Sequence, residues 1–205
     1  RHKPKFDIAV DPVEGTSFLA KGMTNAMAVI AMAPRGAMME PGPAFYMEKF
    51  AGPPSVYGHI DPDMSVKEKL GRLAECEGKP VSEVTVYVLE KPRHKQMVQE
   101  IHDAGARVAL YPAGDVAGAL MAAIPESGID CLMGTGGTPE GIISACAIRA
   151  LGGEFMGRLD PQLAEAQPRA RREGDDEREV LLETELGQIP DPVTEKMGAE
   201  STSAT

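Results

Sequence analysis

The chain has 205 residues, of which 42% are hydrophobic, and it carries a formal net charge of −10 at pH 7. It is long enough to bury a hydrophobic core, either as one large domain or as two small ones. The acidic balance argues against non-specific binding to nucleic acid or to an anionic membrane and favours a multivalent cation as partner. No apolar stretch reaches the roughly 18 to 20 residues of a membrane span, so a membrane partner is not expected.

Three cysteines, Cys76, Cys131 and Cys146, are widely spaced, and the chain has neither a Cys-x-x-Cys pair nor histidines at zinc-finger spacing. This pattern predicts free thiols in a reducing compartment, so we expect a cytoplasmic protein. The first methionine is Met23, and the charged start of the chain is not followed by the hydrophobic segment of a signal peptide. We therefore expect the natural N-terminus to precede Arg1.

The segment 11–16 has the sequence Asp-Pro-Val-Glu-Gly-Thr and follows the apolar run 8–10. It predicts a strand, an acidic turn and the start of a helix. Asp11 and Glu14 are three positions apart at the end of the predicted strand, so their carboxylates can point into one pocket. Hard oxygen ligands of this kind suit Mg²⁺ or Mn²⁺.

The second half of this segment predicts an anion site beside the cation site. Gly15 lets the backbone approach a ligand closely, and Thr16 or Ser17 can cap the following helix. The free N–H groups at such a helix start attract an anion. Metal-assisted phosphate ester hydrolysis needs this combination, because the metal polarises the phosphoryl oxygens and lowers the pKa of an attacking water. An acidic turn before a capped helix is the alternative.

The neighbouring sequence predicts further short elements. We expect a buried strand over 6–10, a second apolar run over 26–33 and a third strand over 45–50. In the third strand Tyr46 can face the core or a cleft, and a core or interface position is favoured. Ser65 and Glu68 form a capping box at the start of a helix that is expected to end at Gly78.

After this helix, short apolar strands alternate with helices. The predicted strands cover 84–89, 107–111 and 129–133, and the predicted helices cover 92–104, 116–124 and 139–151. Such alternation predicts a parallel sheet with helices on both faces. Ligands of these sheets bind at the carboxyl ends of the strands.

Two of the turns at these strand ends are charged. In the first, residues 91–95 place four cations or potential cations around a helix N-terminus. Positive side chains oppose the helix dipole there, so either a bound phosphate or solvent must offset them. The second turn, 112–115, carries Asp115, for which a helix N-cap is the favoured role.

The third turn, 134–141, is rich in glycine, which permits close approach of the backbone to a ligand. Thr138 can cap the next helix, and Pro139 suits its first position. The turn is not a Walker A loop, because Gly-Lys-Ser/Thr is absent, and Pro139 replaces the last glycine of a dinucleotide fingerprint. Glu140 is favoured by the dipole in any first helical turn, but at this strand end it is also a candidate third metal carboxylate.

Together these motifs resemble those of the class II fructose-1,6-bisphosphatases, within the lithium-sensitive sugar phosphatase superfamily. The resemblance covers residues 5–159 and is strongest over 8–16, 46–49, 91–94 and 136–145, continuing through 148–153. It implies an α/β protein with the layered α-β-α-β-α sugar phosphatase fold, incomplete in this chain.

The resemblance also implies roles for individual residues. Asp11, Glu14 and Glu140 correspond to ligands of Mg²⁺ or Mn²⁺, and with Thr16 they form the expected catalytic set. The positions that correspond to substrate contacts are Glu14, Gly15, Thr16, Tyr46, Lys91, Pro92, Arg93, Ala113, Gly114, Asp115 and Gly137. Ala113 stands where the family has an aspartate, so one substrate-contacting carboxylate is missing.

The implied reaction is hydrolysis of fructose 1,6-bisphosphate to fructose 6-phosphate and phosphate, in gluconeogenesis and glycerol metabolism. The Gly15 and Thr16 amides would hold the reacting phosphate, the Thr16 hydroxyl would orient the water, and Lys91 and Arg93 would anchor the other phosphate. The alternatives are another sugar or inositol phosphate phosphatase, such as a sedoheptulose 1,7-bisphosphatase, and an inactive remnant that binds sugar phosphates. The sequence leaves the oligomeric state open, including a homo-oligomer.

We expect residues 1–80 to form a partial metal- and phosphate-binding subdomain and residues 81–159 an α/β sugar-phosphate subdomain. Residues 160–205 are expected to form a divergent, partly disordered tail with one amphipathic element over 180–189. The family carries further acidic metal ligands upstream of the Asp-Pro motif, and its C-terminal sequence is not recognisable after 159. We therefore expect the middle of such an enzyme, with weak folding, little activity and little thermal stabilisation by Mg²⁺.

Overall fold

The structure is a computed structural model that describes residues 5–40, 45–160 and 194–196. The strands are β1 (Phe6–Glu14), β2 (Met27–Pro34), β3 (Tyr46–Gly52), β4 (Thr85–Leu89), β5 (Arg107–Tyr111), β6 (Cys131–Gly137), β7 (Glu154–Leu159) and β8 (Thr194–Lys196). The α-helices are α1 (Thr16–Ala20), α2 (Val66–Glu77), α3 (Lys95–Asp103), α4 (Asp115–Ala123) and α5 (Thr138–Leu151). Short 3₁₀ helices are η1 (Pro54–Val56), η2 (Val81–Glu83) and η3 (Pro92–His94).

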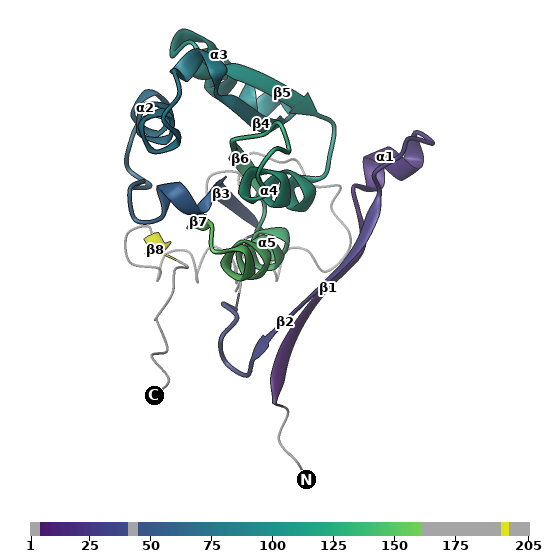
Figure 1. The fold of residues 1–205 in the computed structure, drawn as a ribbon. Helices are drawn as coiled ribbons and strands as arrows, with labels where there is room; N and C mark the ends of the chain where they lie inside the picture. The colour runs from purple at the N-terminus through teal and green to yellow at the C-terminus, as the bar shows by residue number, and fades with distance from the viewer. Residues whose placement is uncertain (1–4, 41–44, 161–193, 197–205) are drawn as a thin grey trace, which may run out of the picture.

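Helices cover both faces of a six-stranded sheet, in which the strand order is β5-β4-β6-β3-β7-β8. The helices α2 and α3 pack on one face, and α4 and α5 pack on the other (Figure 1). In β4, Val86 and Val88 join the core on the α2 side, whereas Tyr87 between them joins the core on the α4 side. A strand that is buried on both faces has apolar residues at successive positions, as β4 does. The helices on both faces of the sheet confirm the predicted layered α/β class.

The sheet is mixed, so the prediction of a purely parallel sheet was wrong in one respect. The strand β4 pairs in parallel with β5 and β6, but β3 pairs antiparallel with both β6 and β7. The strands β4 to β7 therefore share one direction, and β3 runs against them from a position between β6 and β7. The alternating pattern did not reveal this, because β3 precedes that pattern in the sequence and reaches its place through long-range pairing. The sheet joins residues of both predicted subdomains, 1–80 and 81–159.

The strands β1 and β2 form a separate antiparallel hairpin that packs on α5, outside the α4 and α5 layer (Figure 1). Its inner face contributes Ala31 to a small core with Val116 and Ile143. On its outer face Phe6, Ile8, Val10, Ile30 and Met32 are all more than half exposed. The strand predicted over 6–10 is therefore present, but its predicted burial was wrong, because only one face of the hairpin has a partner within the described residues.

The Asp-Pro-Val-Glu segment belongs to β1 and not to a turn, with an irregularity in strand pairing between Asp11 and Glu14. The helix α1 begins after Gly15, which adopts a left-handed conformation with φ 80°, and no side chain caps it. The prediction that Thr16 or Ser17 caps this helix was therefore wrong. Because the helix is only five residues long, it adds little dipole field.

The predicted capping box and free thiols were confirmed. Ser65 and Glu68 form the complete capping box of α2, which ends at Gly78 with φ 65°. The three cysteines are free thiols. Within the described residues, no helix combines the length and the hydrophobicity needed to cross a membrane. The predictions for the charged tail, including the amphipathic element over 180–189, lie outside the described residues.

Candidate active site

The carboxyl ends of β4, β5 and β6 meet at one edge of the sheet, because these strands are parallel. The first residue of β3, Tyr46, joins this edge by pairing with Gly137 at the end of β6. The turns that carry the predicted substrate contacts follow these three strand ends: Lys91 to Arg93 after β4, Ala113 to Asp115 after β5, and Gly137 to Glu140 around the end of β6. We call this the strand-end edge.

Glu14 links the Asp-Pro-Val-Glu segment to this edge. Its side chain is buried, and its Oε1 accepts a hydrogen bond of 3.0 Å from the backbone N–H of Val116 in α4. Burial, together with the nearby charges of Asp115 and Asp11, raises the pKa of Glu14 to about 7. At neutral pH roughly half of the Glu14 carboxyl groups then keep their proton unless a cation takes its place.

Asp115 is paired with a buried lysine that sequence reasoning did not identify. Lys49 Nζ donates to Asp115 Oδ2 at 2.5 Å, and the Lys49 side chain is only 1% exposed. The N-cap position of α4 is held by Gly114 with φ 89°, so the N-cap role predicted for Asp115 was wrong. The available signal was a lysine among the apolar residues Met47, Phe50 and Ala51 of β3, all of which are buried.

The glycines of the predicted third turn make room for side chains. Residues 134–137 are part of β6. A Cβ on Gly136 would lie 2.5 Å from Asp115 Oδ2, and a Cβ on Gly137 would overlap Glu140 Oε2. A Cβ on Gly141 would lie 3.1 Å from Lys49 Cε. The Gly-Gly-Thr-Pro-Glu-Gly motif therefore clears space for the charged side chains at this edge.

Thr138, expected as a helix cap, is the first residue of α5, and Gly137 holds the N-cap position. The Thr138 hydroxyl is buried and has no hydrogen-bond partner in the part of the chain that the structure describes. Thr138 lies inside the first turn and its hydroxyl makes no hydrogen bond within the described residues, so it does not cap the helix. The capping prediction was therefore wrong. Pro139 lies in the first turn of the helix, where its missing N–H costs nothing.

The cationic turn after β4 is tied to neighbouring strand ends. Lys91 Nζ donates to the carbonyl of Pro112 at 2.9 Å, and Arg93 Nε donates to the carbonyl of Thr135 at 2.9 Å. The Arg93 guanidinium lies 5.5 Å from the centre of the half-buried Tyr46 ring. Both cations therefore lie at the strand-end edge, and within the described residues each has N–H groups left over for a ligand.

His94, a third potential cation of this turn, is structural. It is buried, its Nδ1 lies 2.7 Å from the carbonyl of Leu89, and its Nε2 accepts from the N–H of Thr135 at 2.9 Å. Burial lowers its pKa, so the ring is neutral at pH 7. His94 joins the ends of β4 and β6 and adds no charge to the turn.

Tyr87 supports the turn before α4, and sequence reasoning also missed this role. Its hydroxyl lies 3.0 Å from the carbonyl oxygen of Ala113 and 2.8 Å from that of Gly114, so one phenolic proton is shared by the two acceptors. Its ring stacks on Tyr111 with 4.2 Å between centroids. Burial raises the pKa of Tyr87, which keeps this donor protonated. The hydroxyl thus fixes the left-handed turn that positions Asp115.

The predicted metal ligands are only partly brought together. Asp11 lies close enough to Glu14 to raise its pKa, and Asp11 Oδ1 accepts from the N–H of Val13 at 2.9 Å. Glu140 lies against Gly137 at the start of α5. Within the described residues, no group of three or more His, Cys, Asp or Glu side chains is placed to hold a metal ion. The donor chemistry fits a hard divalent cation, while the described ligand set is incomplete.

Comparison with known proteins agrees with these motifs. Residues 1–191 match the family model described as bacterial fructose-1,6-bisphosphatase, glpX-encoded. This match extends past residue 159, where the recognisable motifs end.

Three cyanobacterial proteins named D-fructose 1,6-bisphosphatase class 2/sedoheptulose 1,7-bisphosphatase are similar over 161 residues. They come from Synechocystis sp. (47% identical), Microcystis aeruginosa (46%) and Crocosphaera subtropica (47%). Each alignment covers 78% of this chain and 46% of the relative, so the chain spans about half the length of these relatives. By the extent of the family match, the chain belongs to the bacterial glpX-encoded fructose-1,6-bisphosphatases.

Proposed function

We propose that this chain takes part in metal-dependent hydrolysis of a sugar bisphosphate, removing the 1-phosphate of fructose 1,6-bisphosphate to give fructose 6-phosphate in cytoplasmic gluconeogenesis and glycerol metabolism. The observation that carries the proposal is the contact between Glu14 and the start of α4. This contact brings the Asp-Pro-Val-Glu-Gly-Thr segment to the strand-end edge, where Lys91 and Arg93 supply positive charge for a second phosphate. Family membership supports the same reaction.

Asp11, Glu14 and Glu140 are the residues that would hold Mg²⁺ or Mn²⁺. The bound metal supplies Lewis-acid stabilisation of the phosphoryl oxygens and a water of lowered pKa. The Glu14 carboxyl must give up its proton to act as a ligand, and its pKa of about 7 allows this near neutral pH.

Other groups bind the two phosphates and orient the attacking water. The backbone amides of Gly15 and Thr16 hold the reacting phosphate, and the Thr16 hydroxyl orients the attacking water. Lys91 and Arg93 anchor the other phosphate, for which bidentate Arg contacts are well suited. In the hydrolysis a water oxygen forms a bond to phosphorus, the bond between phosphorus and the sugar oxygen breaks, and a proton passes to that oxygen.

The substrate contacts predicted around the sugar are Tyr46, Pro92, Ala113, Gly114, Asp115 and Gly137. Three of them depend on internal supports: Asp115 on Lys49, and the carbonyls of Ala113 and Gly114 on the Tyr87 hydroxyl. Rigid supports of this kind hold a sugar in one orientation relative to the reacting phosphate.

Sedoheptulose 1,7-bisphosphate is the second candidate substrate, because the names of all three relatives include it. The two substrates share a phosphate at each end and differ by one carbon in the sugar. A panel of fructose 1,6-bisphosphate, sedoheptulose 1,7-bisphosphate and inositol 1-phosphate separates these specificities by their kcat/KM values.

Phosphate release from this panel, measured with Mg²⁺ or Mn²⁺, tests the proposal. We expect weak release from a sugar bisphosphate, above that of the blank, by the unmodified chain and by Glu83→Gln, which removes one exposed carboxylate just before β4, at the opposite end of this strand from Lys91. Glu14→Gln should reduce release to the level of the blank. Equal rates for the two variants would contradict the proposal, and calorimetric binding of substrate without release would indicate an inactive remnant.

A further inference from the structure

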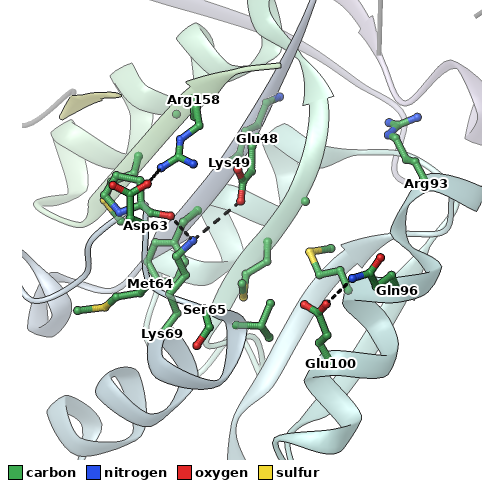
Figure 2. Close-up of a pocket in the computed structure, with 18 residues that line it drawn as sticks. Glu48, Lys49, Asp63, Met64, Ser65, Lys69, Arg93, Gln96, Glu100 and Arg158 are labelled. Carbon is green, nitrogen blue, oxygen red and sulfur yellow. Dashed lines mark hydrogen bonds and ion pairs between the residues drawn. The ribbon is translucent and has the colours of Figure 1, made fainter. Parts of the chain in front are cut away.

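A separate pocket of about 430 Å³ lies on the α2 and α3 face of the sheet. It is bordered by the N-terminal ends of these two helices and floored by β3, β6 and β7 (Figure 2). Its floor residues Phe50, Met133 and Met156 belong to the core beneath α2 and α3. Lys49, in contrast, directs its ammonium to Asp115 on α4, so this pocket and the Glu14 cluster lie on opposite faces.

Lys69 of α2 provides a buried cation in this pocket. The residue is 6% exposed, and its Nζ donates to the carbonyl of Pro62 at 2.9 Å. Its nearest carboxylate oxygen, from Glu48, is 3.9 Å away, which is beyond hydrogen-bond distance (Figure 2). An ammonium carries three N–H donors, so two of them have no acceptor among the described residues.

A second cation, Arg158 of β7, lies beside Lys69. Its guanidinium pairs with Asp63, but its Nε is buried and has no hydrogen-bond partner within the described part of the chain. Burial and the charge of Arg158 lower the pKa of Lys69, the charges of Glu48, Asp63 and Asp61 raise it, and the net shift is downward. The carboxylates of Asp63 and Glu48 are 80% and 48% exposed and are therefore hydrated. Among the described residues that line this pocket, the buried side-chain atom without any hydrogen-bond partner, Arg158 Nε, is a donor.

The rest of the wall is mixed: Ser65, Gln96 and Glu100 contribute polar groups, and the other part is apolar. It contains Val66, Met97, Met133 and Met156 together with the ring of Phe50. Methionine side chains are unbranched and polarizable, so they adapt to ligands of different shape and contact aromatic rings favourably. The volume of the pocket lies within the range of small-molecule sites.

We propose that this pocket binds a small organic anion, with its anionic group at the Lys69 ammonium and its apolar body against the methionines. The anion supplies the acceptors that Lys69 lacks, and the exposed carboxylates at the rim stay in water. Arg93, which we place in the substrate site, also borders the pocket. The proposal does not depend on the proposed reaction, because it concerns binding without metal or sugar bisphosphate.

The test uses 3-phenylpropionate as the anionic probe and 3-phenylpropanol as its uncharged counterpart, with dissociation constants measured by calorimetry or ligand-observed NMR. Lys69→Met removes the ammonium and keeps the length of the side chain. The control is Lys67→Met, which removes an exposed ammonium from the same helix. We expect saturable binding of phenylpropionate that is at least tenfold weaker in Lys69→Met and unchanged in Lys67→Met. Binding of phenylpropanol should be the same in both variants.

Several results would overturn the proposal. These are no saturable binding of phenylpropionate, equal affinities for the two lysine variants, or loss of binding in Glu14→Gln, which would place the probe in the reaction site. A folding check by thermal melting accompanies each variant. Should Lys69→Met fail to fold, Lys69→Gln, which keeps one polar group, is expected to show the same weakening.

Discussion

Two buried lysines lie on opposite faces of the sheet and differ in how they are compensated. Lys49 is fully enclosed and has a carboxylate oxygen of Asp115 at 2.5 Å. Lys69 is almost as buried, but its nearest carboxylate oxygen is 3.9 Å away and belongs to a half-exposed Glu48. The first lysine is committed to an internal ion pair, whereas the second keeps donors for an external partner. Burial of a charge therefore does not by itself say whether the charge is structural or binds a ligand.

The largest expected difference comes from removing each ammonium. Lys49→Met leaves the Asp115 carboxylate without a counter-charge beside Glu14, and loss of one partner of a buried pair costs about 3–5 kcal/mol. Lys69→Met leaves only exposed carboxylates behind, so we expect a change of less than about 1 kcal/mol. Urea unfolding of both variants measures the two values. Equal losses of stability would show that the two lysines do not differ as described.

A smaller effect is expected from crowding the Lys49–Asp115 pair. Gly136→Ala places a Cβ 2.5 Å from Asp115 Oδ2, and overpacking of this kind costs about 1–3 kcal/mol. The matched control is Gly71→Ala in α2, where an added Cβ meets nothing within 4 Å. That control should be neutral or stabilising by up to about 1 kcal/mol, because alanine favours a helix. A neutral Gly136→Ala, judged by urea unfolding, would mean that the pair is not held as tightly as the structure indicates.

Tyr87→Phe tests the support of the turn that carries Asp115. It leaves the carbonyls of Ala113 and Gly114 without their hydroxyl donor, which costs about 1–3 kcal/mol for buried acceptors. Tyr111→Phe keeps the stacked ring and should change stability by less than about 0.5 kcal/mol. The same variants should differ in phosphate release, with a raised KM for Tyr87→Phe only. Similar behaviour of the two variants in both assays would rule out the positioning role of Tyr87.

A pH dependence of stability is also expected in the absence of divalent cations. The pKa of Glu14 is about 7 in the folded chain, above its ordinary value of 4.5. The folded state then binds more protons between these values, so this contribution is fully present below pH 4.5 and is lost as the pH rises through 7. Thermal melts from pH 5 to 8 in EDTA should fall more steeply for the unmodified chain than for Glu14→Gln. Parallel curves would show that Glu14 has an ordinary pKa.

Much of the fold was predictable because it depends on local patterns. The period of the apolar residues identified β4 and β5 and located α2 and α4 within a residue or two, and the capping box at Ser65 marked the start of α2. The direction of β3 and the exposure of β1 were not predictable. They depend on which segments pair across the chain, and a single strand's own residues do not encode its partner.

In the candidate site, too, features that depend on local sequence were predictable, and features that depend on long-range contacts were not. Motifs and spacing located Glu14, Lys91, Arg93 and the turn containing Asp115, and the structure places them around one strand-end edge. The roles of Lys49, Tyr87 and His94 were missed, because each acts through a contact with a residue more than 20 positions away. The room that the glycines of the third turn leave for side chains was not predictable for a related reason, since the side chains that fill their Cβ space come partly from β3 and α4.

Binding of Mn²⁺, followed by electron paramagnetic resonance, tests most directly whether Glu14 is part of a metal site. The unmodified chain and Glu83→Gln should bind Mn²⁺ more tightly at pH 8 than at pH 6, by about tenfold, because the proton on Glu14 competes with the cation. Glu14→Gln should bind Mn²⁺ more weakly at pH 8 and should lose most of the pH dependence. Equal binding by Glu14→Gln and Glu83→Gln at both pH values would contradict the account.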